Sequence, residues 1–177
     1  MKFYISDLHF GHENIIRLCN RPFSSVEEMD KAMIDNWNAV VKPNDEVYIL
    51  GDFCFKGVNS AESYVKKLNG KKYLICGNHD KMNSELRKCF EWVRDYAEVH
   101  DEGKKIVLSH YPMVEWNGFF HGSLHFYGHI HNSTDTTAYK VMKEIPNAFN
   151  VGADILGFTP RTLGAVIDCN VRFNRVA

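Results

Sequence analysis

Short apolar segments recur along the chain, and most of them end at a glycine or a polar residue. Apolar runs of this length, bounded by turn-forming residues, are typical of β-strands that are buried in a sheet. The pattern therefore predicts strands at Phe3–Ile5, Val47–Leu50, Tyr73–Cys76, Val93–Val99, Ile106–Leu108, Leu124–Tyr127, Ala148–Val151 and Ala165–Ile167.

A helical periodicity separates the first two of these strands. Ser25 and Glu28 have the spacing of a capping box, and Pro43 marks the end of the helix that follows. Shorter helices are predicted over Ser60–Leu68 and Ser84–Phe90. The apolar positions of the first helix repeat every three or four residues and should face a sheet: Val26, Met29, Met33, Trp37 and Val40.

The order of these elements predicts a mixed α/β fold. In the first half of the chain strands alternate with helices, which favours a parallel sheet. After Trp92 the strands follow one another closely, and the turn residues Asp101 to Gly103 indicate a hairpin, so antiparallel strands are expected there. At this length a single domain over residues 1–177 is the simplest organisation.

The amino-acid composition limits the classes of protein to which this chain can belong. With 45% hydrophobic and 24% charged residues, the sequence is that of a folded globular protein. A dedicated nucleic-acid binder has a strongly basic surface, whereas this chain has a formal net charge of −1. No export signal or bilayer-spanning apolar run is visible, and the 5 cysteines contain no C-x-x-C pair. We therefore expect a soluble cytoplasmic protein; its 9 histidines call for an explanation.

Polar clusters follow five of the predicted strands. Ligand sites in open α/β sheets lie beyond the carboxyl ends of the strands, so these clusters are expected to converge on one crevice. In an extended segment, the patterns D-x-H and H-x-H place both side chains on one side, where they can bind one metal. Glycines that precede several of the polar residues would permit a close backbone approach. The clusters are Asp7–His9, Gly51–Asp52, Gly77–Asp80, Ser109–His110 and Gly128–His131.

This ordered set resembles the motifs of the calcineurin-like metallophosphoesterases: D-x-H, G-D, G-N-H-D, H and G-H-x-H. The resemblance implies a four-layer α/β/β/α sandwich with two central mixed sheets. It also implies that His79 acts near the leaving group. Two divalent metal ions are implied, one bound by Asp7, His9, Asp52 and His131, and the other by Asp52, Asn78, His110 and His129, with Asp52 bridging.

A centre of this kind is suited to hydrolysis of phosphate esters. Two ions that share a carboxylate and a water can turn the water into hydroxide and stabilise charge on the attacking and leaving oxygens. An imidazolium at His79 can protonate the leaving group. We expect small phosphodiesters, including cyclic or other nucleotides, as substrates, with monoesters as the next option. The mixed ligand set favours Mn²⁺, with Fe, Zn or Ni as alternatives.

One position departs from the family pattern. Many members read G-D-x-x-D-x-G, but Phe55 stands where the second Asp would orient the motif histidine. Asp80 or a backbone carbonyl is then left to orient His79. The candidates for substrate contact are His12, Arg21 and Lys56.

Three alternatives stay open from the sequence. A single His or Asp at a strand end is usually a cap or turn former, although five clusters in this order favour the metal site. A non-catalytic protein-binding scaffold on the same fold would have lost its ligands, and here every ligand position is filled. A nuclease would need tight nucleic-acid binding, which the near-neutral charge disfavours. His125 lies outside every motif and is expected to be structural.

Overall fold

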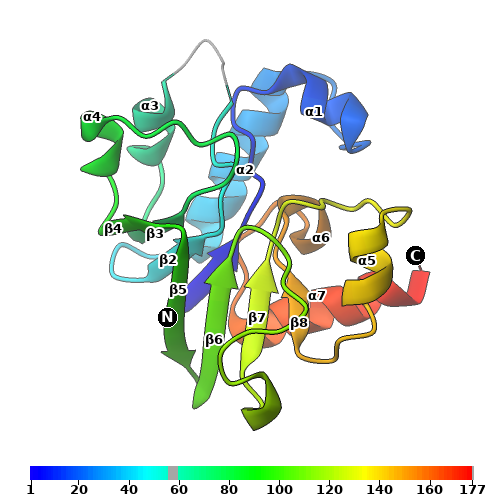
Figure 1. Cartoon of the computed structure of the whole chain (residues 1–177). Coiled ribbons are helices and arrows are strands. Elements are labelled where there is room, and N and C mark those ends of the chain that lie inside the picture. Colours follow the sequence, from blue (N-terminus) through cyan, green and yellow to red (C-terminus); the bar gives the residue numbers. More distant parts are fainter. Residues whose placement is uncertain (56–59, 177) are drawn as a thin grey trace.

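The computed structural model describes residues 1–55 and 60–176, and their strands form two four-stranded sheets (Figure 1). In the first sheet all neighbouring strands run parallel, in the order β1 (Lys2–Ile5), β2 (Glu46–Ile49), β3 (Lys71–Ile75) and β4 (Trp92–Arg94). The second sheet is mixed, in the order β5 (Tyr96–Asp101), β6 (Lys104–Ser109), β7 (Leu124–Tyr127) and β8 (Ala148–Asn150).

Helices accompany both sheets. Figure 1 shows α2 to α4 grouped with the first sheet and α5 to α7 with the second, so the predicted arrangement of two central sheets flanked by helices is confirmed. None of the helices in the described part of the chain is long and apolar enough to cross a membrane. The helices are α1 (Glu13–Leu18), α2 (Val26–Val40), α3 (Ala61–Val65), α4 (Ser84–Arg87), α5 (Thr137–Met142), α6 (Ala153–Leu156) and α7 (Leu163–Val176), with a 3₁₀ turn at Phe119–His121.

The two sheets share one core. The ring of Tyr4 on β1 meets the ring of Phe126 on β7 edge to face, with centroids 4.8 Å apart, and both side chains are fully buried. Helix α2 adds Met29, Met33 and Trp37 to the core, and its first turn is capped by the Ser25 hydroxyl, which accepts a hydrogen bond from the Glu28 amide. The predicted helix and its cap are therefore confirmed.

Two of the strand predictions are wrong. Residues 165–167 belong to α7, where Leu163, Val166 and Asn170 are buried at helical spacing. The segment predicted as one strand over Val93–Val99 is divided near Asp95 into β4 and β5, which lie in different sheets. A short apolar run looks the same in a strand and in one turn of a buried helix, because its hydrophobic periodicity cannot distinguish the two.

The strand directions in the second half also differ from expectation. Only β5 and β6 pair antiparallel, through the hairpin at Glu102 and Gly103, whereas β6–β7 and β7–β8 are parallel. Parallel neighbours need a crossover connection, and residues 110–123 and helix α5 supply these crossovers. Helices α1, α5 and α6, each of four to six residues, were not predicted.

Candidate metal centre

Loops from both sheets meet at the proposed site. In the first sheet, the amide of Asp7 donates to the Gly51 carbonyl at 3.0 Å, so the loops after β1 and β2 continue side by side. In the second sheet, the amide of Gly128 donates to the His110 carbonyl at 2.9 Å. The sheets are joined here by the His110 ring, whose Nδ1 lies 2.8 Å from the Leu50 carbonyl oxygen. Segments far apart in sequence thus converge as the sequence predicted.

The backbone is left-handed at most of the proposed ligands. Non-glycine residues rarely adopt positive φ, and positions held there cluster at functional sites. The expectation that D-x-H and H-x-H are extended is therefore wrong: each side chain is aimed by its own left-handed residue. Of the 8 described non-glycine residues with positive φ, 5 are proposed ligands: Asp7, His9, Asp52, His129 and His131.

Three glycines leave room for these side chains. A Cβ on Gly51 would lie 2.5 Å from the His110 Nδ1, and one on Gly77 would lie 2.5 Å from the Asp52 amide nitrogen. A Cβ on Gly128 would overlap the Ser6 hydroxyl and the Asp7 carboxylate. The predicted need for a close backbone approach at these glycines is confirmed, since a real Cβ does not tolerate such distances.

The ligand atoms form two overlapping groups. Asp7, His9 and His131 present atoms within 4.8 Å of one another, and so do Asp7, Asp52 and His110. Asp7 belongs to both groups, and Asp52 of the second group also reaches the first, because its Oδ2 is 3.5 Å from the His9 Nε2 and 3.6 Å from the His110 Nε2. The four residues Asp7, His9, Asp52 and His110 are almost completely buried.

Asn78 extends the second group. Its Oδ1 lies 3.1 Å from the His110 Nε2 and 3.1 Å from the His129 Nδ1. The ring of Tyr111, which is about half exposed, packs against His129 with centroids 4.6 Å apart. An amide oxygen between two imidazole nitrogens gives a further set of neutral ligands around one point.

One buried atom indicates that the site is suited to a cation. Among the residues that the structure describes, the His9 Nε2 is the one buried side-chain nitrogen or oxygen without a hydrogen-bond partner. Buried polar atoms are normally paired, and an orphan needs an explanation such as an ion. Imidazole nitrogens and carboxylate oxygens lie around the His9 Nε2. Mn, Fe and Zn ions bind donor atoms of these two kinds. The residues present therefore fit a transition-metal site.

The pKa shifts of the buried residues also indicate a site that is suited to a cation. Burial raises the pKa of the Asp7 carboxyl, although the nearby His131 and His110 oppose the rise. Burial lowers the pKa of His9 to about 2, with further contributions from His131 and Arg21. His9 is thus a neutral imidazole with a free lone pair, the form that binds a metal. A cation next to Asp7 would relieve the cost of burying its carboxylate.

Asp154, which was not predicted, supports the ligand His131. Its Oδ2 lies 3.0 Å from the His131 Nδ1, leaving Nε2 as the other ring nitrogen. Burial disfavours the imidazolium form of His131, but the hydrogen bonds with Asp154 and Cys19 and the charge of Asp7 together outweigh burial and raise the pKa to about 10. The signal for Asp154 was its place after the predicted strand Ala148–Val151, where it follows the same strand-end pattern as the other polar clusters.

Arg21 lies beneath the site and not at its rim. Its side chain is 0% exposed, and its Nε donates to the Asp154 carboxylate at 2.8 Å. Its two remaining nitrogens donate to the carbonyls of Leu8 and Asp7. The prediction of substrate contact is therefore replaced by a structural role, since the guanidinium connects the loop after β1 to helix α6.

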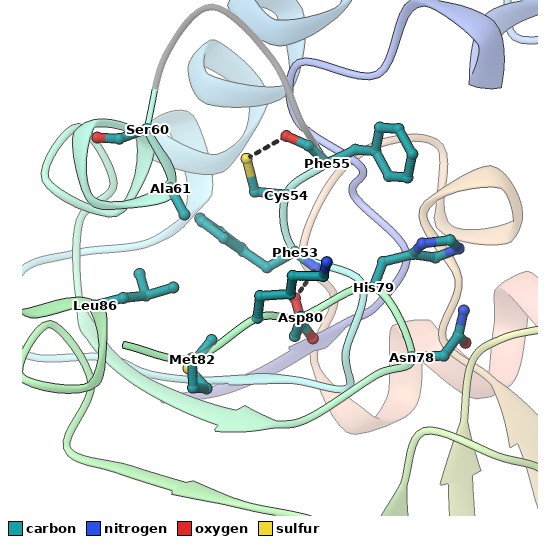
Figure 2. A pocket seen from close by; sticks show the side chains of 11 residues that line it. Phe53, Cys54, Phe55, Ser60, Ala61, Asn78, His79, Asp80, Met82 and Leu86 are labelled. Atoms are coloured by element: carbon teal, nitrogen blue, oxygen red, sulfur yellow. Dashed lines mark hydrogen bonds between the residues drawn. The ribbon is translucent and has the colours of Figure 1, made fainter. Parts of the chain in front are cut away.

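His79 lies at the surface of the site beside Phe55. Its amide donates to the Asp52 Oδ1 at 2.8 Å. The centroids of the His79 and Phe55 rings are 5.2 Å apart, and Figure 2 shows the two side chains near each other. Phe55 also stacks on His12, with centroids 3.9 Å apart. His12 is therefore at the site as predicted, with its Nδ1 3.2 Å from the His9 Nδ1, whereas Lys56 falls outside the described residues.

Asp80 holds loops together and does not orient His79. Its carboxylate accepts hydrogen bonds from the amides of Asp52, Phe53 and Gly77, at 2.8 to 2.9 Å. In Figure 2 its side chain lies under the Phe53 backbone, away from the His79 ring. The contacts of the His79 ring are thus aromatic, with Phe55 and with His9.

Comparison with known proteins agrees with this geometry. A protein of Methanocaldococcus jannaschii described as uncharacterized is 36% identical over 167 residues, covering 93% of this chain and 88% of that protein. The gene 66 protein of Mycobacterium phage L5 is 30% identical over 184 residues, covering 87% of this chain and 86% of that protein. A crystal structure of an Aquifex aeolicus protein of unknown function superposes with a TM-score of 0.72 at 32% identity, over 90% of this chain and 94% of that one.

The family of this chain is shown by its match to the sequence model of a known domain family. The model of the calcineurin-like phosphoesterase superfamily domain matches residues 1–154, a range that contains every proposed metal ligand as well as Asp154. The chain belongs to the calcineurin-like phosphoesterase superfamily.

Proposed function

We propose that this protein is a dinuclear metal-dependent phosphodiesterase. The observation that carries the proposal is the position of Asp52, whose Oδ2 lies 3.5 and 3.6 Å from the imidazole nitrogens of His9 and His110. A carboxylate between two such nitrogens is suited to bridge two cations, because one negative charge can then compensate both. The first ion would be bound by Asp7, His9, Asp52 and His131, and the second by Asp52, Asn78, His110 and His129.

The bound ions would supply Lewis acidity and lower the pKa of water at neutral pH. Nitrogen and oxygen ligands together favour Mn²⁺, with Fe, Zn and Ni as alternatives. A water oxygen then forms a bond to phosphorus while the bond from phosphorus to the leaving oxygen breaks. His79 is exposed at the edge of the centre, where it can give a proton to that oxygen.

The first test is hydrolysis of bis(p-nitrophenyl) phosphate by protein that has been freed of metal and then supplied with Mn²⁺. We expect turnover that depends on the metal, and a loss of at least about a thousandfold in kcat for Asp52→Asn, because the carboxylate between the two ions is lost. Asp168→Asn removes an exposed carboxylate from α7 and should leave the rate unchanged. Absence of turnover by folded protein with any divalent ion would refute the proposal.

The role of His79 is tested by changing the leaving group. An alkoxide needs a proton more than a nitrophenolate does, so His79→Gln should lower kcat much more for an alkyl ester than for a nitrophenyl ester. Equal losses for the two leaving groups would rule out proton donation by His79.

A further inference from the structure

Two cavities border the candidate metal centre, one on each side of a wall formed by Phe55 and His79. The α1 cavity has a volume of about 510 Å³, and the proposed ligands His9, His129 and His131 form its floor. The α4 cavity has a volume of about 490 Å³ and touches the centre only through Asn78. Each volume is in the range of cavities that hold small organic ligands.

The lining of the α1 cavity indicates an uncharged ligand. Its walls are contributed by apolar residues of α1 and the loop after β7, among them Ile15, Leu18 and Ile130. Asn132, Ser133 and Thr136 add polar groups at one edge, and its described lining contains no Lys, Arg, Asp or Glu. A second phosphate in this cavity would find no Lys or Arg among the described lining residues, whereas the apolar walls would accommodate an aromatic or nucleoside group.

Leu18 is a particular feature of this cavity. It is 65% exposed although it faces the cavity, so its apolar surface is left to solvent. A ligand group that covers this surface would gain about 25 cal/mol for each Å² removed from water. Leu18 is thus placed to favour bulky apolar groups over small ones.

The α4 cavity gives room for a second group. Figure 2 shows the Phe55 and His79 rings on one side of it, with Met82, Leu86 and Ala61 on the other. In the wall between the cavities, the Phe55 ring stacks on His12 at an interplanar angle of 16°. A substrate at the centre can therefore extend in two directions from phosphorus, one on each side of Phe55.

We propose that the substrate is a phosphodiester in which an uncharged aromatic or nucleoside group lies in the α1 cavity and stays on phosphorus. The other ester group leaves into the α4 cavity beside His79. The assignment rests on the proposed function, and it follows from the floor of the α1 cavity, which is made of three metal ligands. Water supplies the oxygen that bonds to phosphorus, the bond to the leaving oxygen breaks, and that oxygen takes the His79 proton while the water releases one to solvent.

The test uses diesters with one leaving group and different retained groups. These are the p-nitrophenyl diesters of methyl phosphate, phenyl phosphate and thymidine 5′-phosphate, hydrolysed by the Mn²⁺-loaded protein. We expect kcat/KM to be at least about tenfold higher for the phenyl and thymidine esters than for the methyl ester, mainly through KM. Leu18→Glu should remove most of this preference, because it places a charge at the cavity wall.

The control is Arg17→Gln, which changes the charge of α1 by the same amount at an exposed residue outside the cavity lining. It should preserve the preference. Equal kcat/KM values for the three diesters, or a preference that survives Leu18→Glu, would overturn the proposal. Faster turnover of the monoester p-nitrophenyl phosphate than of the phenyl diester would overturn it as well.

Calorimetry separates this proposal from the proposed function. Phenyl phosphate is expected to bind the Mn²⁺-loaded His79→Gln protein at least about tenfold more tightly than methyl phosphate, and Leu18→Glu should abolish the difference. Phenyl phosphate could bind more tightly as expected while the wild-type protein has no hydrolytic activity. In that case the proposed function fails and the assignment of the α1 cavity stands. Turnover without any preference, together with equal binding, would refute the assignment of the α1 cavity and leave the proposed function standing.

Discussion

Single residues determine the geometry of this site through their backbone. Asp7, His9, Asp52, His129 and His131 all have φ between 50° and 70°, a conformation that disfavours residues with a Cβ. Hydrogen bonds hold the loops in this form; for example, the Asp7 carboxylate accepts from the His129 amide. The side chains are thereby directed to one place before a metal arrives, which reduces the ordering needed for binding.

Asp154 provides a test at this scale. Its carboxylate fixes the ring of His131, so Asp154→Asn should weaken Mn²⁺ binding about 10- to 100-fold. Titration of the metal-free protein with Mn²⁺ by calorimetry measures this change. Asp168→Asn is the matched control, because it removes a carboxylate that is exposed on α7.

A structural effect of Asp154→Asn must be separated from a metal effect, since Arg21 loses its buried partner in the variant. Thermal unfolding of the metal-free variant shows whether it folds at the temperature of titration. A folded variant with unchanged Mn²⁺ affinity would contradict the supporting role of Asp154.

At the scale of elements, the strands place the loops and the loops carry the chemistry. β1 and β2 end next to each other, and so do β6 and β7, because each pair is parallel and in register. His125 contributes to this framework from β7: its Nδ1 lies 3.2 Å from the Val107 carbonyl oxygen on β6, and its Nε2 accepts from the Met113 amide. The structural role predicted for His125 is confirmed.

The burial of His125 makes the stability of these strands depend on pH. Burial lowers the pKa of His125 to about 4, against an ordinary value near 6.5. The unfolded chain therefore binds this proton first as the pH falls, and the free energy of unfolding decreases between pH 6.5 and 4. We expect a loss of about 2 kcal/mol from this residue between pH 7 and pH 5.

The measurement is urea unfolding at pH 7 and pH 5, with a chelator present so that metal release does not contribute. His125→Gln can donate and accept hydrogen bonds with an amide that does not titrate in this range. The variant should lose about 2 kcal/mol less than the wild type between the two pH values. An equal loss in both proteins would show that His125 is not responsible.

At the scale of the whole molecule, the candidate centre lies where the two sheets meet. Asp7, Asp52 and Asn78 follow strands of the first sheet, whereas His110 and His129 follow strands of the second. A bound metal would therefore add to the links between the two halves, which already share the core and hydrogen bonds such as that from the His129 amide to the Asp7 carboxylate. The formal net charge of −1 would also become positive with two divalent ions, and the positive charge would be concentrated where a phosphate binds.

Metal binding should stabilise the folded chain as a whole. An ion that binds only the folded state at 100 times its Kd adds about 2.7 kcal/mol, which corresponds to roughly 5 to 10 °C in Tm at this chain length. Scanning calorimetry with and without Mn²⁺ measures the shift, and a chelator should reverse it. Asp52→Asn is expected to lose most of the shift, and Asp168→Asn to keep it; a shift that is equal in all three proteins would contradict a centre at Asp52.

Much of the fold and of the site could be predicted from the sequence, because strands and their ends are local features. Strand ends are marked by apolar runs followed by glycine and polar residues, so Asp52 and His110 were found as members of strand-end clusters, and the resemblance to a known family implied their roles. Asp154 was missed because a single carboxylate after a strand is not a motif by itself. Arg21 was misplaced because only packing shows that a cation on the loop after α1 points inward to Asp154.

The sequence by itself determined the fold class, the family motifs and the candidate residues of the site, since each depends on side-chain type and spacing along the chain. The tertiary structure decided how those residues are used. It decided that five of the seven proposed ligands are left-handed and not extended, that Asp80 binds backbone amides, and that Phe55 packs between His12 and His79. These features depend on contacts between segments far apart in sequence, whose distances no local pattern of residues records.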